Sequence, residues 1–285
     1  MWKSAIGTLI MAIAIGVGVE KQTGYVWSQI AKQLRAPEPG SLFAIISKRF
    51  MNRSNQIPSQ QLVDLIHPSP GSVLLEIGPG FGFALEHLFA NYQPGRVYGV
   101  ELSEDFFQGL RTKFAKHFKS GQLVVYNQDA KDLSFFLEDN SVDAIYALNV
   151  IYFLNPLPEY LQEFYRVLKP GGKVVFGVYE VAKTMDPTIF VNRDWDVCLE
   201  ALKQVGFEDA ARGQQPLFNA RNGPQAGTTL TGTKPMPPPP PPPPPVEEVE
   251  AEGEGVEPDE SNDGEKIEDS VGENENENEQ EQKEM

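Results

Sequence analysis

The sequence predicts an α/β protein with a Rossmann-like sheet of seven mostly parallel strands, helices on both faces and a disordered C-terminal tail. Short apolar runs alternate with amphipathic stretches from residue 73 to residue 233, which is the pattern of βα repeats around a parallel sheet. A glycine-rich turn follows the first apolar run, and open α/β sheets bind ligands at that end of their strands. After residue 236 the chain becomes proline-rich and then glutamate-rich, with too little apolar surface to form a core.

The apolar runs place the strands, and the amphipathic stretches place the helices. We expect strands at 73–77, 96–101, 123–127, 144–149, 173–178 and 228–233. We expect helices at 83–90, 103–118, 157–168 and 195–205. Ser103 suits the N-cap of its helix, because its hydroxyl can accept from a free backbone N–H and acidic residues follow it in the first turn. The KPGGK stretch at 169–173 predicts the end of a helix and a turn into a strand.

Changes in composition divide the chain into parts. These are a hydrophobic N-terminal segment (1–28), a helical lead-in that acts as a lid and breaks at Pro37 and Pro39 (29–61), the main domain (62–235), a polyproline run (236–245) and an acidic tail (246–285). The tail holds 18 acidic and two basic residues, which account for the whole net charge of −16. The remaining residues carry 22 charges of each sign, so no basic stripe is left over to bind nucleic acid.

The few cysteines and histidines argue against two kinds of site. With a single cysteine, Cys198, no disulfide can form within the chain. His67, His87 and His117 lack the spacing of metal ligands, so we expect no metal site. Cys198 falls in a predicted helix, where a buried, unreactive thiol is favoured over a reactive one.

Residues 5–19 form an unbroken run of apolar and small side chains. As a helix this run would reach ~22 Å at ~1.5 Å per residue, short of the ~30 Å hydrocarbon core of a bilayer. A short membrane anchor, a signal or organelle-targeting peptide and a packed helix all fit this length. We favour membrane association through residues 4–19, and therefore expect a membrane-associated protein.

The glycine turn reads GPGFG and places Gly78, Gly80 and Gly82 at alternate positions after the first strand. A nicotinamide or flavin site would have the spacing G-x-G-x-x-G/A, but its third position here is Phe83. Glu76 stands two residues before the first glycine. An acidic residue ahead of G-x-G-x-G resembles motif I of the class I S-adenosylmethionine-dependent methyltransferases.

The later strands continue this resemblance over about residues 62–235, and it is closest to the group that includes ubiquinone and menaquinone biosynthesis methyltransferases. The stretch FYRVLKPGGKVVFG also fits the helix, turn and fifth strand of small-molecule members of this family. The resemblance implies S-adenosyl-L-methionine as cofactor. It implies cofactor-binding residues at the ends of successive strands, namely Glu76, Gly78, Gly80, Gly82, Glu101, Asp129, Ala130 and Asn149.

The resemblance also gives these residues separate roles. The glycines let the backbone approach the methionyl portion, and Glu76 receives its amino group. Glu101 accepts hydrogen bonds from the ribose hydroxyls, while Asp129 and Ala130 recognise the adenine amino group. Each acidic residue has an ordinary alternative: Glu76 as a surface-facing strand residue, Glu101 as an acid opposite the helix dipole, and Asp129 as a turn cap.

Asn149 and Tyr152 are the residues expected to face the methyl acceptor. Tyr152 either contacts the acceptor or packs beneath a lid. Val150 and Ile151 replace the prolines of the N/D-P-P-Y/F signature of amino-group methyltransferases. This difference argues against a nucleobase or a glutamine amide as the methyl acceptor. The lid residues are expected to be Met51, Asn52 and Asn55. The apolar lid and the N-terminal segment favour a small lipophilic acceptor.

The proline run supports a second kind of function. Lys234, Pro237 and Pro240 have the basic-x-x-P-x-x-P spacing of SH3 ligands, and plain proline runs also fit WW, EVH1 or profilin grooves. The alternative function is therefore a catalytically inactive methyltransferase-fold scaffold that docks partners through residues 234–245. A stiff spacer before a solubilising tail is the simpler interpretation of the same run.

Overall fold

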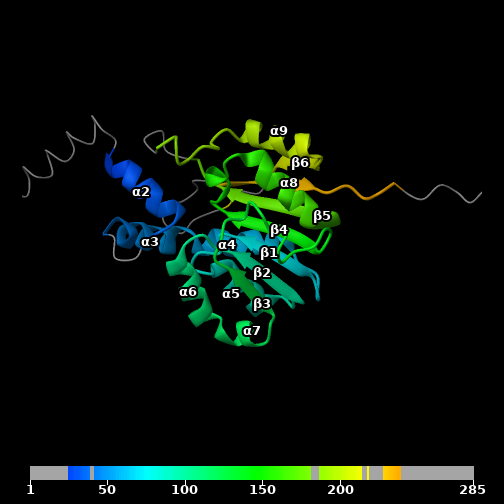
Figure 1. The fold of residues 1–285 in the computed structure, drawn as a ribbon, viewed down its shortest axis with the longest axis horizontal. Coiled ribbons are helices and arrows are strands. Elements are labelled where there is room, and N and C mark those ends of the chain that lie inside the picture. The colour runs from blue at the N-terminus through cyan, green and yellow to red at the C-terminus, as the bar shows by residue number, and fades with distance from the viewer. Residues whose placement is uncertain (1–24, 39–41, 181–185, 214–216, 218–226, 239–285) are drawn as a thin grey trace, which may run out of the picture. The chain divides into compact units, whose positions relative to one another are not determined.

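One mixed sheet of seven strands, in the order β3-β2-β1-β4-β5-β7-β6, organises the part of the chain that the structure describes (Figure 1). The computed structural model describes residues 25–38, 42–180, 186–213, 217 and 227–238. The strands are β1 Val73–Ile77, β2 Arg96–Val100, β3 Leu123–Tyr126, β4 Val142–Leu148, β5 Leu168–Val178, β6 Glu208–Arg212 and β7 Thr228–Thr233. β1 to β5 pair in parallel, and β7 pairs antiparallel with β5 and β6. The predicted α/β fold class is confirmed, and the predicted disordered tail lies outside the described residues.

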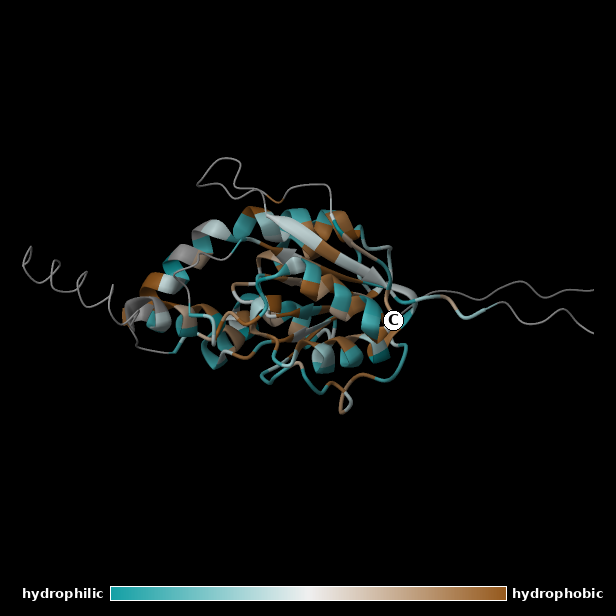
Figure 2. Cartoon of the chain, turned by 90° about the horizontal axis from the view of Figure 1, so that it is seen from above, coloured by the Kyte–Doolittle hydropathy of each residue, from teal (hydrophilic) through white to brown (hydrophobic). Residues whose placement is uncertain are grey.

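Helices cover both faces of this sheet. They are α2 Tyr25–Arg35, α3 Leu42–Ser54, α4 Gln56–Ile66, α5 Phe83–Asn91, α6 Glu104–Lys113, α7 Ala115–Lys119, α8 Leu157–Val167 and α9 Trp195–Val205, with a 3₁₀ turn at Ile151–Phe153. Because neighbouring strand residues point to opposite faces, Leu74 packs in a core with α4 and α5, whereas Leu75 packs in a second core with α8 and α9. In Figure 2 the helices alternate between brown and teal, as expected when one face of each is apolar.

Two predicted boundaries need correction. The helix expected at 103–118 breaks at Phe114 into α6 and α7, and the Phe114 ring is buried against Gly82. The KPGGK turn does not precede the strand but lies within β5, because the register jumps from Val142 opposite Leu168 to Ala144 opposite Lys173. The extra residues form a bulge there.

The N-terminal helices α2 and α3 together form what we call the cap, residues 25–54. α2 ends at Arg35, before Pro37. Three contacts hold the cap and its connection to the domain: Ser103 Oγ donates to Pro37 O at 3.1 Å, Lys48 pairs with Asp105, and α3 packs on α4. α4 crosses the predicted boundary between residues 61 and 62. In Figure 1 the dark blue cap lies beside α4 and α6.

The membrane segment predicted at residues 4–19 lies outside the described residues. Among the residues that are described, none of the helices combines the length and the apolar character needed to cross a bilayer.

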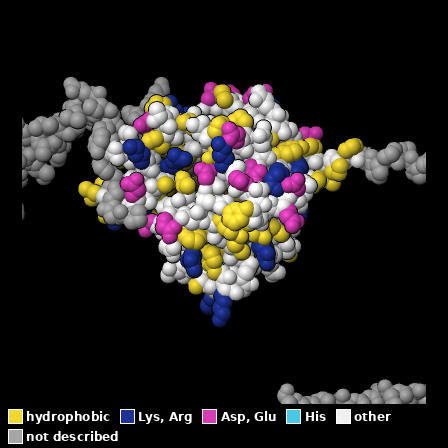
Figure 3. Space-filling view, viewed as in Figure 1, with side chains coloured by type: hydrophobic (Ala, Val, Ile, Leu, Met, Phe, Trp, Pro, Cys, Tyr) yellow, Lys and Arg dark blue, Asp and Glu magenta, His cyan; other side chains and the backbone are white. Residues whose placement is uncertain are grey.

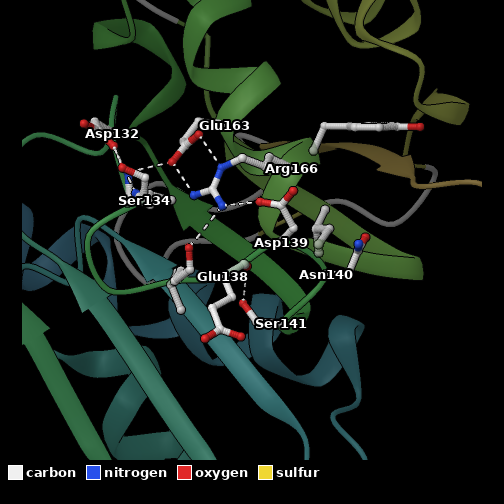
Figure 4. Close-up of polar contacts among 12 residues, drawn as sticks. Asp132, Ser134, Glu138, Asp139, Asn140, Ser141, Glu163 and Arg166 are labelled. Atoms are coloured by element: carbon white, nitrogen blue, oxygen red, sulfur yellow. Dashed lines mark hydrogen bonds and ion pairs between the residues drawn. The ribbon is translucent and has the colours of Figure 1, made fainter.

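Arg166 ties the long connection between β3 and β4 to helix α8 (Figure 4). Its guanidinium forms two hydrogen bonds with Glu163, at 2.9 and 2.7 Å, and donates to Asp139 Oδ1 at 2.6 Å and to Leu137 O at 3.1 Å. Glu163 in turn accepts from the backbone N–H of Leu133 at 2.6 Å. This network fixes the segment that follows the end of β3.

Replacing Arg166 by leucine should therefore lower the free energy of unfolding by about 2–3 kcal/mol, because hydrogen bonds to charged groups contribute ~1.5–3 kcal/mol. The matched control is Arg212→Leu, whose ion pair with Glu180 is exposed and should change stability by less than ~0.5 kcal/mol. Urea unfolding of both variants measures the difference, and equal losses would contradict the assigned role of Arg166.

Candidate functional site

A cavity of about 650 Å³ opens at the carboxyl ends of the parallel strands, with the cap as one of its walls. This volume lies within the range of ~300–1,000 Å³ that is usual for small-molecule sites. Its floor comes from the segments that follow β1, β2, β3 and β4, and its upper wall comes from α2 and α3. The position agrees with the rule that open α/β sheets bind ligands at this edge.

The three glycines of the turn all have positive φ, at 68° for Gly78, 54° for Gly80 and 71° for Gly82, yet they serve different purposes. A Cβ on Gly78 would come within 2.7 Å of Val150, and one on Gly82 within 2.5 Å of Phe114. A Cβ on Gly80 would meet no atom closer than 3.9 Å. Gly78 and Gly80 line the cavity, whereas Gly82 does not. Gly82 therefore serves helix packing, and Gly80 presents bare backbone to a ligand.

Glu101 follows β2 and its side chain lies at the centre of the site. It is only 4% exposed, and its carboxylate accepts from Gly80 N at 2.9 Å and from Ser103 N at 2.8 Å. Burial raises the pKa of Glu101 to about 7. A carboxylate has about four acceptor sites, so two remain for a ligand's hydroxyl groups.

Glu76 is buried within the fold and is not the surface-facing strand residue of the alternative interpretation. Its side chain is 5% exposed, and Tyr146 Oη donates to its Oε2 at 3.2 Å. Burial raises the pKa of Glu76 to about 8, and Glu101 adds to the rise by charge repulsion. Because Glu76 lines the cavity, a cationic ligand there would favour its ionised form.

Asp129 and Ala130 follow β3, and both line the cavity. Asp129 is exposed and accepts from Lys131 N at 3.1 Å, so it also caps the turn, as the alternative interpretation expected. Ala130 is buried. Burial and then the hydrogen bond with Asp129 raise the pKa of Tyr160, which keeps this tyrosine a neutral donor beside Asp129.

Asn149 follows β4 with a positive φ of 58° and lines the cavity. Its amide Nδ2 donates to Asn55 Oδ1 at 3.3 Å, which connects the sheet to the start of α4. Tyr152 is 3% exposed; its hydroxyl accepts from Tyr179 N at 2.6 Å and lies within donating distance of Tyr179 O at 2.8 Å and Asn149 Oδ1 at 3.1 Å. Tyr152 therefore holds the ends of β4 and β5 together.

Two of the three predicted lid residues lie at the cavity. Met51 and Asn55 line the cavity, but Asn52 is exposed and is not part of the lining. A larger apolar wall, which was not predicted from the sequence, also lines the cavity; its members are Ile30, Leu34, Ile46, Phe153, Leu154 and Phe190. Ile30 and Leu34 are four residues apart and therefore lie on one face of a helix. This spacing was the sequence signal that could have placed both residues of α2 in the wall.

Two buried hydroxyls at the cavity have no hydrogen-bond partner within the described part of the chain. They are Ser47 Oγ on α3 and Tyr179 Oη just after β5. Burial raises the pKa of Tyr179 to about 12, so this phenol is neutral. Because an unpaired buried polar group is costly, these hydroxyls indicate a ligand that supplies polar atoms.

The charged residues of the lining favour a cation. Within the described ranges they are four carboxylates, Glu76, Glu101, Asp129 and Glu180, and one guanidinium, that of Arg35. By contrast, charges of both signs intermix over the surface in Figure 3. No group of His, Cys, Asp or Glu in the described ranges is arranged to hold a metal ion. Cys198 is buried as predicted, and burial raises its pKa to about 11.

The raised pKa of Glu76 predicts how stability depends on pH. Between the ordinary pKa of 4.5 and about 8, the folded protein holds more protons than the unfolded chain, so the stability that protonation confers is lost as pH rises. Glu76→Gln should flatten this decline and raise the melting temperature at pH 8 by several degrees. Thermal unfolding at pH 5.5 and pH 8 measures the effect, with the exposed Glu208→Gln as control. Parallel pH curves for Glu76→Gln and the original chain would contradict the assignment.

Comparison with known proteins agrees with this geometry. A family profile described as a methyltransferase domain matches residues 75–176. Phosphoethanolamine N-methyltransferase of Triticum aestivum is 26% identical over 136 residues, covering 47% of this chain and 26% of that protein. Sterol 24-C-methyltransferase erg-4 of Neurospora crassa is 32% identical over 154 residues, covering 47% and 39%. The chain thus spans about a quarter to two fifths of the length of these relatives.

A solved structure supports the fold. The methyltransferase in a complex with the Trm112 activator of Haloferax volcanii superposes with a TM-score of 0.57 at 19% identity, covering 66% of this chain and 93% of that one. The strand order, the glycine turn and the profile match lead to one conclusion: residues 75–176 lie in a class I methyltransferase domain, of the family whose cofactor is S-adenosyl-L-methionine.

Proposed function

We propose that this chain transfers a methyl group from S-adenosyl-L-methionine to a small lipophilic acceptor bound beneath the cap. The observation that carries the proposal is the continuity of one cavity, which joins an acidic, glycine-lined end to an apolar wall. Bringing two reactants into one water-poor cavity in the right orientation is the main requirement of this reaction. The sulfonium of the cofactor supplies an electrophilic methyl group, and its leaving group needs no protonation.

The acidic end has the features that the cofactor needs. Glu101 keeps two acceptor sites for the ribose hydroxyls, and Gly80 leaves room for the methionyl portion. Glu76 would receive the amino group, while Asp129 and Ala130 would face the adenine. The excess of carboxylates in the lining also suits a ligand that carries a sulfonium and an ammonium.

The apolar end favours a lipophilic acceptor over a phosphorylated one. The aliphatic and aromatic side chains of the apolar wall surround this end. Ser47 and Tyr179 offer hydroxyls to one polar group of an acceptor. A phosphate needs several cationic donors, but among the described residues of the lining the one cationic side chain is that of Arg35. An acceptor of the class named for the Neurospora relative, a sterol, therefore fits better than the phosphobase named for the wheat relative.

The contacts of Lys234, the first residue of the predicted docking motif, argue against the scaffold alternative. Lys234 Nζ donates to Asn140 Oδ1 at 2.7 Å, Tyr165 O at 2.7 Å and Leu168 O at 2.8 Å. Lys234 thus closes the C-terminal end of α8, and an SH3 domain would have to break these bonds to use it as a ligand. The proline run beyond residue 238 lies outside the described residues, so docking to WW, EVH1 or profilin partners stays a prediction.

A label-transfer assay tests the function. The full-length chain is incubated with methyl-labelled cofactor and a mixture of a sterol, a quinol and phosphoethanolamine, with Gly80→Arg as the control that fills the cavity. We expect label in the apolar extract and none with the control. Label only in phosphoethanolamine would overturn the acceptor class. A folded chain that neither transfers label nor binds S-adenosylhomocysteine would favour the scaffold.

Gly80→Ala should weaken S-adenosylhomocysteine binding tenfold or more, because the added methyl group enters the cavity. Gly71→Ala is a matched control, since Gly71 also has a positive φ of 80° and open space around it, but it lies outside the cavity lining. Both variants should lose ~1–2 kcal/mol of folding stability from the left-handed backbone. Calorimetric titration measures the affinities for S-adenosylhomocysteine. An equal loss of affinity in the two variants would contradict this explanation.

Glu101→Ala should weaken the same binding by ~2 kcal/mol or more, because two charge-assisted hydrogen bonds are lost. The affinity of the original chain should also fall as pH drops below about 7, where Glu101 becomes protonated. Titrations at pH 6 and pH 8 measure both effects. An affinity that depends on neither Glu101 nor pH would remove this carboxylate from the cofactor site.

A further inference from the structure

Helix α3 exposes a row of large aliphatic side chains. Leu42, Ile45 and Ile46 are 68%, 60% and 52% exposed. Because they are three and four residues apart, they lie on one face of the helix, which we call the α3 face. Contiguous exposed apolar surface of this kind marks an interaction site more often than scattered apolar residues do.

The charged residues in the sequences of α2 and α3 are all basic. The sequences of α2 and α3 contain no aspartate or glutamate, and they contain the basic residues Lys32, Arg35, Lys48, Arg49 and Arg53. Lys48 pairs with Asp105 of α6, whereas Arg49 on the same helix is exposed. An apolar row beside basic residues is the composition of helices that lie on anionic bilayers.

The α3 face is continuous with the cavity. Ile46 is both exposed on this face and part of the cavity lining. Leu102, which follows β2, is 42% exposed and also lines the cavity. Apolar surface therefore extends from the outside of the cap into the apolar end of the site. A lipophilic molecule could follow this surface without crossing water.

The sequence places a second apolar element close to the cap. The apolar stretch of residues 5–19 ends shortly before α2, which begins at Tyr25. If that stretch associates with a bilayer, the short connection keeps the cap near the same surface.

We propose that the α3 face rests on an anionic lipid surface and that the acceptor enters the cavity from the bilayer past Ile46. This inference rests on the proposed function, because it specifies the source of the lipophilic acceptor. It assigns the cap two tasks: its inner side forms the wall of the cavity, and its outer side contacts lipid.

The test uses a polarity-sensitive fluorophore attached to the full-length chain at Ile45→Cys. The matched control is Val197→Cys on α9, a site that is 64% exposed and lies outside the cap and the cavity lining. Cys198 is replaced by alanine in both variants. Vesicles contain phosphatidylcholine and phosphatidylserine, with or without a lipid that carries a quencher in its acyl chain.

The Ile45 probe should shift to the blue and lose at least half of its emission to the quencher, whereas the Val197 probe should change little. Vesicles of phosphatidylcholine alone should give a smaller response. A probe that stays in water while the chain sediments with vesicles would overturn the inference, since residues 1–24 would then act alone. A probe already shielded without vesicles would also overturn it, in favour of cover by the N-terminal segment or a second copy.

Titration of S-adenosylhomocysteine into the same labelled chains separates this inference from the proposed function. If the ligand binds and the Ile45 probe stays in water, the lipid contact is wrong and the methyltransferase proposal stands. If the ligand does not bind to the folded chain, the proposed function itself fails, whatever the probe reports.

Discussion

The site depends on the hydrogen bonds that the carboxylate of Glu101 accepts from two backbone N–H groups. One of its oxygens accepts from Gly80 N and fixes the glycine turn, and the other accepts from Ser103 N at the start of α6. Ser103 Oγ then donates to Pro37 O between the two cap helices. Burial makes this carboxylate costly to ionise, and the backbone donors offset part of that cost. A single side chain thereby sets the positions of the turn, of α6 and of the base of the cap.

The cap covers the open sheet edge and gives the site two chemically different ends. The carboxylates and bare glycine backbone belong to the strand ends, which are held by the parallel sheet. Half of the apolar wall, namely Ile30, Leu34 and Ile46, belongs to α2 and α3, which lie outside that sheet. Under the proposed function, variation in the cap would act mainly on the acceptor, because function in these folds resides in the elements placed around the sheet edge.

The sequence predicted most strands of the sheet but not the apolar end of the cavity. β1 and α9 match their predicted bounds because apolar spacing reflects burial directly. β6 received no predicted range because its residues are mostly exposed and lack apolar alternation. Gly82 resembled a cofactor residue, but only the position of Phe114 shows that it serves packing. The unpaired hydroxyls of Ser47 and Tyr179 depend on tertiary contacts, which no local pattern contains.

The most direct test of the account is a crystal structure of the full-length chain with S-adenosylhomocysteine. We expect both ribose hydroxyls within hydrogen-bond distance of the Glu101 carboxylate, the adenine beside Asp129 and Ala130, and the sulfur directed toward the apolar wall beneath the cap. A ligand bound away from Glu101, or a cavity that remains empty at saturating ligand, would contradict the central claim that this carboxylate organises a cofactor site.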